Sequence, residues 1–298
     1  MSKKVVGVLE LLLTAFIWGI AFVAQSVGMK YIGPFTFNCI RFFIGGIILI
    51  PVIILLKNRN KEEIKTQSIQ TLEEKKKYTV WGGILCGILL CSASTFQQMG
   101  ICRTSVGKAG FITALYIIIV PLLGIFLHKG ITLLLGISTI IAMLGFYLLC
   151  ISGQIKINSG DILVLICAFI FSLHILVIDY FSPKGNGVAV SCIQFFVSAL
   201  ISGIFMFLFE KPVMTQILSA YVPILYAGVL SCGVAYTLQI IGQQKMEPTV
   251  ASLILSLESV FSALAGWIIL KQGLSLKELI GCMFVFIAVI LAQLPHRN

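Results

Sequence analysis

Charged residues are scarce in this chain of 298 residues, where aspartate, glutamate, lysine and arginine together make up 11%. A typical soluble domain carries roughly 25%, and 11% is too little to cover the surface of a 32.6 kDa globule. Hydrophobic residues reach 59%, and the mean hydropathy is +1.07. The low charge therefore excludes an ordinary water-soluble protein and indicates an integral membrane protein.

Common catalytic and metal-binding motifs are also missing. The sequence has no G-x-x-x-x-G-K-[ST] loop, so no P-loop ATPase lies within it, and no H-E-x-x-H metalloprotease motif. Its nine cysteines form no C-x-x-C and no zinc-type spacing with histidine, so we interpret them as small hydrophobic residues. Asp161 and Asp179 lie near opposite ends of one predicted helix, too far apart to share a proton. We expect neither an enzyme nor a bound metal or cofactor.

What the chain does contain is a series of long apolar segments. A transmembrane helix needs about 20 predominantly apolar residues. The first segment is too long for the apolar part of a signal peptide, so we interpret it as a spanning helix. We expect an all-α integral membrane fold of ten transmembrane helices, near 5–27, 33–56, 79–101, 105–128, 131–151, 161–182, 187–209, 217–242, 248–270 and 274–294.

The two halves of the sequence repeat each other. A shift of 142 residues aligns three positions of the first half with identical residues of the second: Thr95, Gln97 and Gly100 with Thr237, Gln239 and Gly242. We therefore expect two five-helix domains, 1–153 and 160–294. Because five is an odd number, the copies must insert with opposite orientations. Inverted repeats around a site at the midplane are typical of secondary transporters.

The net charge of +10 is distributed as a membrane orientation signal. With a cytoplasmic N-terminus, thirteen lysines and arginines fall in inner segments and seven in outer ones, as the positive-inside rule requires. Seven of the thirteen lie in the one long connection, residues 57–78. The pattern predicts a multi-pass protein of the cell membrane with both termini and this connection in the cytoplasm. It predicts no nucleic-acid partner.

Three segments carry a resemblance to a known family. They are TAFIWGIAFVAQSVGM (14–29), FQQMGICRTSVGKAGFITALYIIIVPLLG (96–124) and SLILSLESVFSALAGWIIL (252–270). All three resemble EamA-type carriers of the drug/metabolite transporter superfamily, and the resemblance spans nearly the whole chain. It implies a cavity between the halves and alternating access. It also implies a small organic cargo, such as an amino acid or a related compound, with export the commoner direction.

Polar side chains deep in apolar helices are the candidates for cargo contact, because lipid cannot satisfy them. We expect five of them to bind substrate: Trp18, Tyr116, His174, Tyr236 and Glu258. Tyr116 and Glu258 occupy matching positions of the repeat, each about ten residues into its predicted helix. Glu258 is the best candidate for binding cargo or a coupling proton. A protonated carboxyl bonded to a neighbouring serine is the structural alternative, while Trp18 and His174 could serve packing alone.

Four further residues are expected to line the cavity or its gates. They are Gln25, Ser94, Gln97 and Gln239, with Gln97 near the outer mouth and Gln239 near the inner one. Arg41 matches an arginine of the family. It lies only about eight residues from one end of its predicted helix, which favours structural anchoring.

Two other function classes stay open from the residues alone. One is a membrane-embedded enzyme acting on lipid or peptide, and the other is a non-transporting scaffold or sensor. The inverted repeat and the missing catalytic cluster favour a carrier whose partners are a small-molecule substrate, the lipid bilayer and a coupling proton. Gly83 and Gly87 allow close helix contact within one chain or between two, which leaves monomer and homodimer open.

Overall fold

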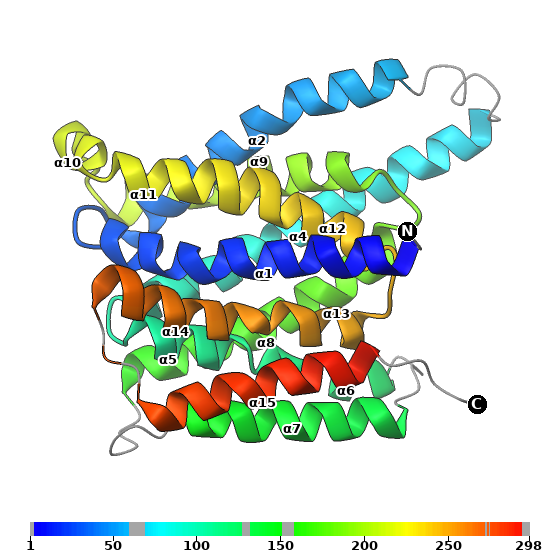
Figure 1. The fold of residues 1–298 in the computed structure, drawn as a ribbon. Helices are drawn as coiled ribbons and strands as arrows, with labels where there is room; N and C mark the ends of the chain where they lie inside the picture. The colour runs from blue at the N-terminus through cyan, green and yellow to red at the C-terminus, as the bar shows by residue number, and fades with distance from the viewer. Residues whose placement is uncertain are drawn as a thin grey trace.

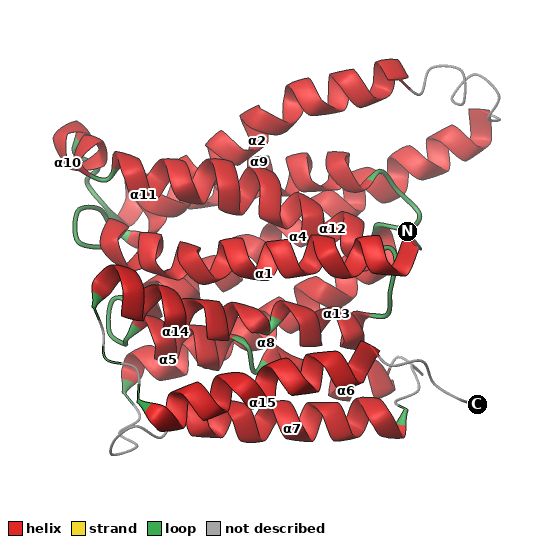
Figure 2. Ribbon diagram, viewed as in Figure 1, coloured by secondary structure: helices red, strands yellow, loops and turns green. Residues whose placement is uncertain are grey.

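Every regular element of the structure is helical. The computed structural model describes residues 3–59, 69–126, 132–150, 158–271, 273 and 275–293. Within these ranges there is no strand, and the helices lie side by side (Figure 2). The start of α1 and the end of α15 are at the same end of the molecule (Figure 1).

The first half contains α1 (Lys3–Gly28), α2 (Pro34–Arg59), α4 (Ile69–Ile101), α5 (Val106–Thr113), α6 (Tyr116–Phe126) and α7 (Leu133–Cys150). The second half contains α8 (Ser159–Phe181), α9 (Gly187–Phe209), α10 (Met214–Ser219), α11 (Tyr221–Leu225), the π-helix η1 (Tyr226–Tyr236), α12 (Thr237–Gln243), α13 (Pro248–Leu255), α14 (Leu257–Leu270) and α15 (Leu276–Gln293).

Eight helical spans in the described residues are long and apolar enough to cross a membrane. Three of the eight combine consecutive elements: α5 with α6, α11 with η1 and α12, and α13 with α14. The remaining two predicted spans correspond to α7 and α15, whose apolar parts are shorter: Leu133–Gly145 and Leu279–Ala292. The structure thus supports a multi-pass membrane protein with eight candidate spans.

Several helix starts follow local capping signals. Asn158 and Asp161 form a reciprocal capping box before α8, in which each side chain accepts the other residue's backbone N–H at 2.9 Å. Asn186 caps α9 by accepting the N–H of Ala189 at 3.1 Å. Pro248 occupies the first position of α13, where its missing N–H costs nothing. These residues fix where the helices of the second half begin.

One helix extends well beyond its predicted limit. The sequence predicts a start at residue 79, whereas α4 begins at Ile69. The additional residues include Gln70, Leu72, Glu74 and Lys75, all of types with high helix propensity, so the helix continues as a polar segment. Hydropathy identifies only the apolar part of such a helix, which is why the prediction started late.

Two predicted helices are interrupted half-way along. The first breaks at Ala114–Leu115, between α5 and α6, and the second at Ser256, between α13 and α14. The 142-residue shift relates the two positions. Pro121 lies inside α6, beyond the first break, so the interruption does not coincide with a proline. As a result, both α6 and α14 begin in the middle of their spans.

A series of serines accompanies the second interruption. Ser252, Ser256, Ser259 and Ser262 each donate a hydroxyl hydrogen bond of 2.7–2.8 Å to the carbonyl three residues earlier. Such bonds compete with the regular helical ladder. At the break the backbone follows the same short spacing, since the N–H of Ser259 donates to the carbonyl of Ser256 at 3.1 Å.

Predicted helix 217–242 also differs from its expected form. It consists of α11, η1 and α12 in succession, with the short α10 before it. A π-helix of 11 residues is unusual, because π-helices mostly occur as single turns, often at functional sites. Thr14 of α1 donates its hydroxyl to the carbonyl of Ala235 in η1 at 3.1 Å. The hydroxyl of Tyr226 in turn donates to the carbonyl of Ile17, also at 3.1 Å.

The most extensive helix contacts join the two halves. They pair α7 with α15 along one edge (Figure 1), α4 with α8, α2 with α9, and α1 with α14 and η1. Small residues allow this closeness. A Cβ at Gly19 would lie within 3 Å of backbone atoms of Phe261 and Ser262 in α14. Gly83 and Gly87 both face α9, against Ile193 and Val197, so these two glycines serve a contact within the chain.

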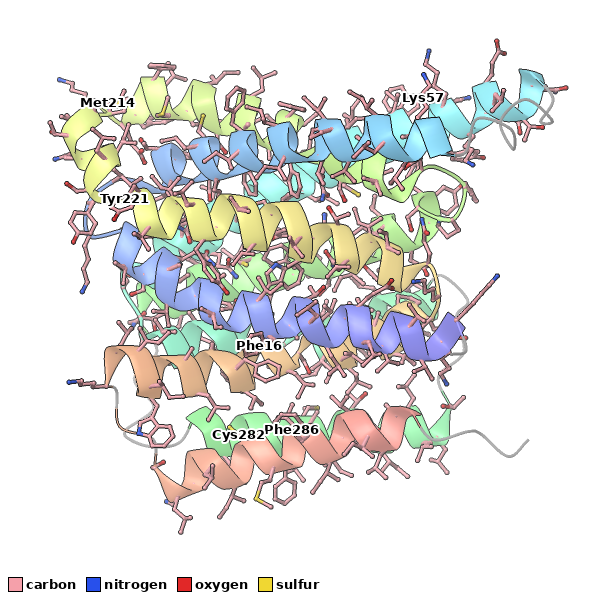
Figure 3. All side chains as sticks on the ribbon, turned by 45° about the horizontal axis from the view of Figure 1, so that its top comes forward. Phe16, Lys57, Met214, Tyr221, Cys282 and Phe286 are labelled. Carbon is pink, nitrogen blue, oxygen red and sulfur yellow. The ribbon has the colours of Figure 1, made fainter. Side chains whose placement is uncertain are left out.

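A line of aromatic rings extends this packing toward α15. Phe16 lies edge-to-face with Phe261 at 5.4 Å between ring centres, and Phe261 with Phe286 at 6.2 Å. Phe16 and Phe286 lie on facing sides of α1 and α15 in Figure 3. The same view places Lys57 at one end of the molecule and Met214 with Tyr221 at the other.

Candidate functional site

A narrow, largely buried cavity lies between the halves. The side chains that line it come from both: Trp18, Phe22 and Gln25 of α1, Arg41 of α2, Gln97 of α4, Thr113 and Tyr116 from the α5–α6 span, Phe171 and Ile175 of α8, Ser231 and Tyr236 of η1, Gln239 of α12, and Leu255 and Glu258 from the α13–α14 span. The wall thus combines aromatic rings with amides, one acid and one arginine, as is typical of sites for small polar molecules.

Seven of the nine predicted site residues meet at this cavity: Trp18, Gln25, Gln97, Tyr116, Tyr236, Gln239 and Glu258. Ser94 and His174 are buried outside its lining. The Nε2 of His174 is hydrogen-bonded to the Oε1 of Gln194 at 3.0 Å, and its ring contacts that of Tyr236. His174 therefore lies in a second layer behind Tyr236, which its position along the helix could not reveal.

Gln97 and Gln239 do not form exposed mouths in this conformation. Their exposed fractions are 6% and 2%, and both belong to the wall of the same cavity. Gln97 donates to the hydroxyl of Thr113 at 3.3 Å. Counting residues from the helix ends predicts depth, but it cannot show that neighbouring helices cover these side chains.

Six residues of the wall carry buried polar atoms that make no hydrogen bond within the described structure. These atoms are Trp18 Nε1, Gln25 Oε1, Arg41 Nε and Nη2, the Tyr116 hydroxyl, Gln239 Oε1 and Glu258 Oε1. Buried polar groups in folded proteins are nearly always satisfied. Their concentration around one cavity leaves these atoms available for hydrogen bonds to a molecule in it.

Glu258 and Tyr116 are positioned by the two interrupted helices. Tyr116 is the first residue of α6, and Glu258 is the second residue of α14. Both side chains are buried, with Glu258 only 3% exposed, and each is close enough to influence the other. Because helix N-termini carry partial positive charge, the first turn of α14 is a favourable place for a carboxylate.

Trp18 and Tyr236 form an aromatic wall between α1 and η1. Their ring centres are 4.6 Å apart at an angle of 58°, and Phe195 packs edge-on against Tyr236 at 5.8 Å. The hydrogen bonds from Thr14 and Tyr226 fix η1 against α1 beside this pair. The rings are thus held by contacts on both sides, as a preorganised binding surface requires.

Prediction from the sequence did not place three polar residues in the cavity lining: Arg41, Thr113 and Ser231. For Arg41 a signal was present, since an arginine within an apolar helix is costly unless it serves a function. Thr113 and Ser231 gave no such signal, because isolated hydroxyl residues are common in membrane helices and can bond their own backbone.

Polar contacts join the halves at both ends of the molecule. Asp161 of α8 accepts from Lys108 at 2.6 Å and from Thr104 at 2.8 Å. At the other end, Lys245 is 2.5–2.6 Å from both carboxylate oxygens of Glu10. We call these the Asp161 cluster and the Glu10–Lys245 ion pair. Together they hold the halves against each other on both sides of the cavity.

Comparison with known proteins supports this architecture. A solved crystal structure that is 17% identical superimposes with a TM-score of 0.74, covering 98% of this chain and 96% of the other, which shows a shared fold. An uncharacterized transporter of Archaeoglobus fulgidus is 28% identical over 98% of this chain and 87% of its own length. The uncharacterized transporter YoaV of Bacillus subtilis is 21% identical, with coverages of 96% and 94%.

A family model matches the chain twice. The EamA-like transporter family covers residues 5–151 and again 158–294, which together include nearly all of the sequence. The chain belongs to the EamA-like transporter family.

Proposed function

We propose that this protein is a secondary transporter that carries a small organic metabolite, an amino acid or a related compound, out of the cell across the cytoplasmic membrane. The observation that carries the proposal is the cavity between the halves, whose wall combines an aromatic surface with six residues bearing unpaired buried polar atoms. Family membership and the names of the relatives support the transporter class.

The proposed architecture is ten transmembrane helices in two inverted five-helix domains, 1–153 and 160–294. The two family matches support it, as do the interruptions at Ala114–Leu115 and Ser256, which the repeat relates. In this proposal α7 and α15 complete the ten spans, and both termini face the cytoplasm. The predicted boundary between the domains lies mostly outside the described residues.

Glu258 is the proposed binding group for a cationic amine of the cargo or for a coupling proton. A buried carboxylate is costly unless a counter-charge or a proton compensates it. If the same carboxylate oxygen binds the amine and the proton in turn, transport of the cargo is coupled to transport of the proton. Trp18 and Tyr236 would contact the rest of the cargo, and Tyr116 would donate its hydroxyl.

Alternating access requires the Asp161 cluster and the Glu10–Lys245 ion pair to open in turn. Cysteines at Gln97 and Gln239 should then change their reactivity toward a thiol reagent in opposite senses when cargo is added. Parallel changes at the two positions would contradict rocking of the halves about a central site.

The central test is counterflow in vesicles that contain the purified protein. Vesicles loaded with one unlabelled amino acid should accumulate the same labelled compound, and vesicles without protein should not. Metabolite levels inside and outside cells that lack or overproduce the protein select which compounds to test. If the purified protein shows no counterflow for any of the selected compounds, the transport proposal is contradicted. A non-transporting scaffold or sensor would then be the remaining function.

A further inference from the structure

Arg41 is a buried cation with no acidic partner among the described residues. Its exposed fraction is 2%, and neither Nε nor Nη2 makes a hydrogen bond within the described residues. The ion pairs found in that part of the chain, Lys108–Asp161 and Lys245–Glu10, do not involve it. A buried charge is costly unless it is paired and hydrogen-bonded, so a structural anchor would be expected to have an anion beside it.

The surroundings hold the guanidinium in place without satisfying it. Its central carbon lies 4.6 Å from the ring centre of Phe42 and 5.6 Å from that of Phe37. These rings offer cation–π attraction, which leaves the N–H groups in the plane of the guanidinium available. Arg41 lines the cavity, so those donors can meet a molecule bound there.

The chemistry of a guanidinium selects the kind of group that it binds. Its fixed fork of N–H donors matches a carboxylate through two parallel hydrogen bonds. Glu258 lines the same cavity, yet no ion pair joins it to Arg41. The wall therefore presents a cation and an acid as separate sites, which suits a molecule that carries both charges.

Arg41 has no charged counterpart in the second half of the repeat. Gln194 occupies the position of the second half that corresponds to Arg41 under a shift of 153 residues. It is fully buried, uncharged, and hydrogen-bonded to His174. The cavity is thus electrostatically asymmetric between its halves, with a single arginine in its wall.

We infer that Arg41 binds the carboxylate of the cargo and thereby restricts the transporter to molecules that bear one. The inference rests on the proposed transport function. It deepens that function by assigning opposite ends of a zwitterion to Arg41 and Glu258.

The test compares acids with their esters on the purified full chain in detergent. Each proteinogenic L-amino acid is titrated in a thermal-shift assay beside its methyl ester, which keeps the amine and side chain but removes the anionic carboxylate. Loss of a charge-assisted hydrogen bond weakens binding by about 10- to 150-fold. Wild-type protein should therefore prefer an acid over its ester by about that factor.

Three variants locate the preference. R41Q should bind acid and ester equally weakly, and R41K should keep part of the preference, because it retains a charge without the fork. The matched control R103Q changes an exposed arginine at a corner outside the cavity and should behave as wild type. If R41Q does not fold, R41K and the wild-type comparison still decide the question.

Equal binding of acids and esters by the wild type would overturn the role of Arg41, as would an unchanged preference in R41Q. Either result leaves the transport proposal standing if counterflow is observed. A wild type that responds to no acid but shows counterflow of a neutral or cationic metabolite also overturns the inference alone. Absence of both binding and counterflow would contradict the role of Arg41 and the transport proposal together.

Discussion

Replacement of Glu258 by glutamine should separate transport from folding. The side chain is 3% exposed, and its Oε1 makes no hydrogen bond in the described structure. Its interaction with the Tyr116 hydroxyl can be kept by the amide oxygen of glutamine. Glutamine has nearly the same shape and is less costly to bury than a charged carboxylate. The melting temperature of E258Q should therefore equal or exceed that of the wild type.

Cargo binding should respond in the opposite way. A hydrogen bond between an amine and a carboxylate contributes about 1.5–3 kcal/mol, which corresponds to roughly a 10- to 150-fold loss of apparent affinity. In the wild type, protons compete with the amine for Glu258, so cargo binding should weaken as the pH falls. In E258Q this dependence should disappear.

The assay is counterflow in vesicles held at equal pH on both sides, repeated over a range of pH values. E247Q provides a matched control, because Glu247 is exposed at the start of α13 and lies outside the cavity lining. A normal rate and an unchanged pH profile in E258Q would refute the proposed role and make the glutamate structural. A large loss of stability in E258Q would refute the argument that glutamine preserves the packing and contacts at this position.

Three further results are expected. A cysteine at Met214 should react with an impermeant thiol reagent on intact cells, whereas one at Lys57, at the opposite end (Figure 3), should react only after lysis; the reverse pattern would contradict the orientation. G19L should lower the free energy of unfolding by about 1–3 kcal/mol, because the larger side chain overpacks against α14. Its melting temperature is compared with that of the control G107L, where a Cβ meets nothing within 4 Å. K245M removes an ion pair whose side chains are 22% and 17% exposed, so the free energy of unfolding should change by at most about 1 kcal/mol. Thiol labelling of the cavity from that end of the molecule should become faster. An unchanged labelling rate would contradict a role of the ion pair in closing the cavity.

Physical constraints explain which parts of the fold the sequence could predict. Lipid forces apolar residues onto helix surfaces, so hydropathy located the spans, including α8, predicted at 161–182 and found at Ser159–Phe181. The repeat pairs Tyr116 with Glu258, and the structure places both in the cavity lining. The interruption at Ser256 could not be predicted, because it depends on which backbone bonds the serines replace.

The site was harder to predict because it depends on side-chain direction and on neighbours. Depth alone made His174 and Trp18 equal candidates, yet only Trp18 reaches the cavity, while His174 bonds Gln194 behind it. Depth also suggested an anchor at Arg41, since nothing in the sequence shows that no acid lies beside it. The π-helix η1 was also missed, and its hydrogen bonds with α1 join residues more than 200 positions apart in the sequence.

The pairing of helices across the halves has a consequence for biosynthesis. The partners of α1 and α7, namely α14 and α15, are the last helices to leave the ribosome. Until they arrive, the nascent first half must lie in lipid with Arg41 and Gln97 lacking their final surroundings, and closing such distant contacts is slow. Insertion and tertiary assembly are therefore separate events in the life of this chain. The interval between them is when a membrane chaperone or protease would meet its polar surface.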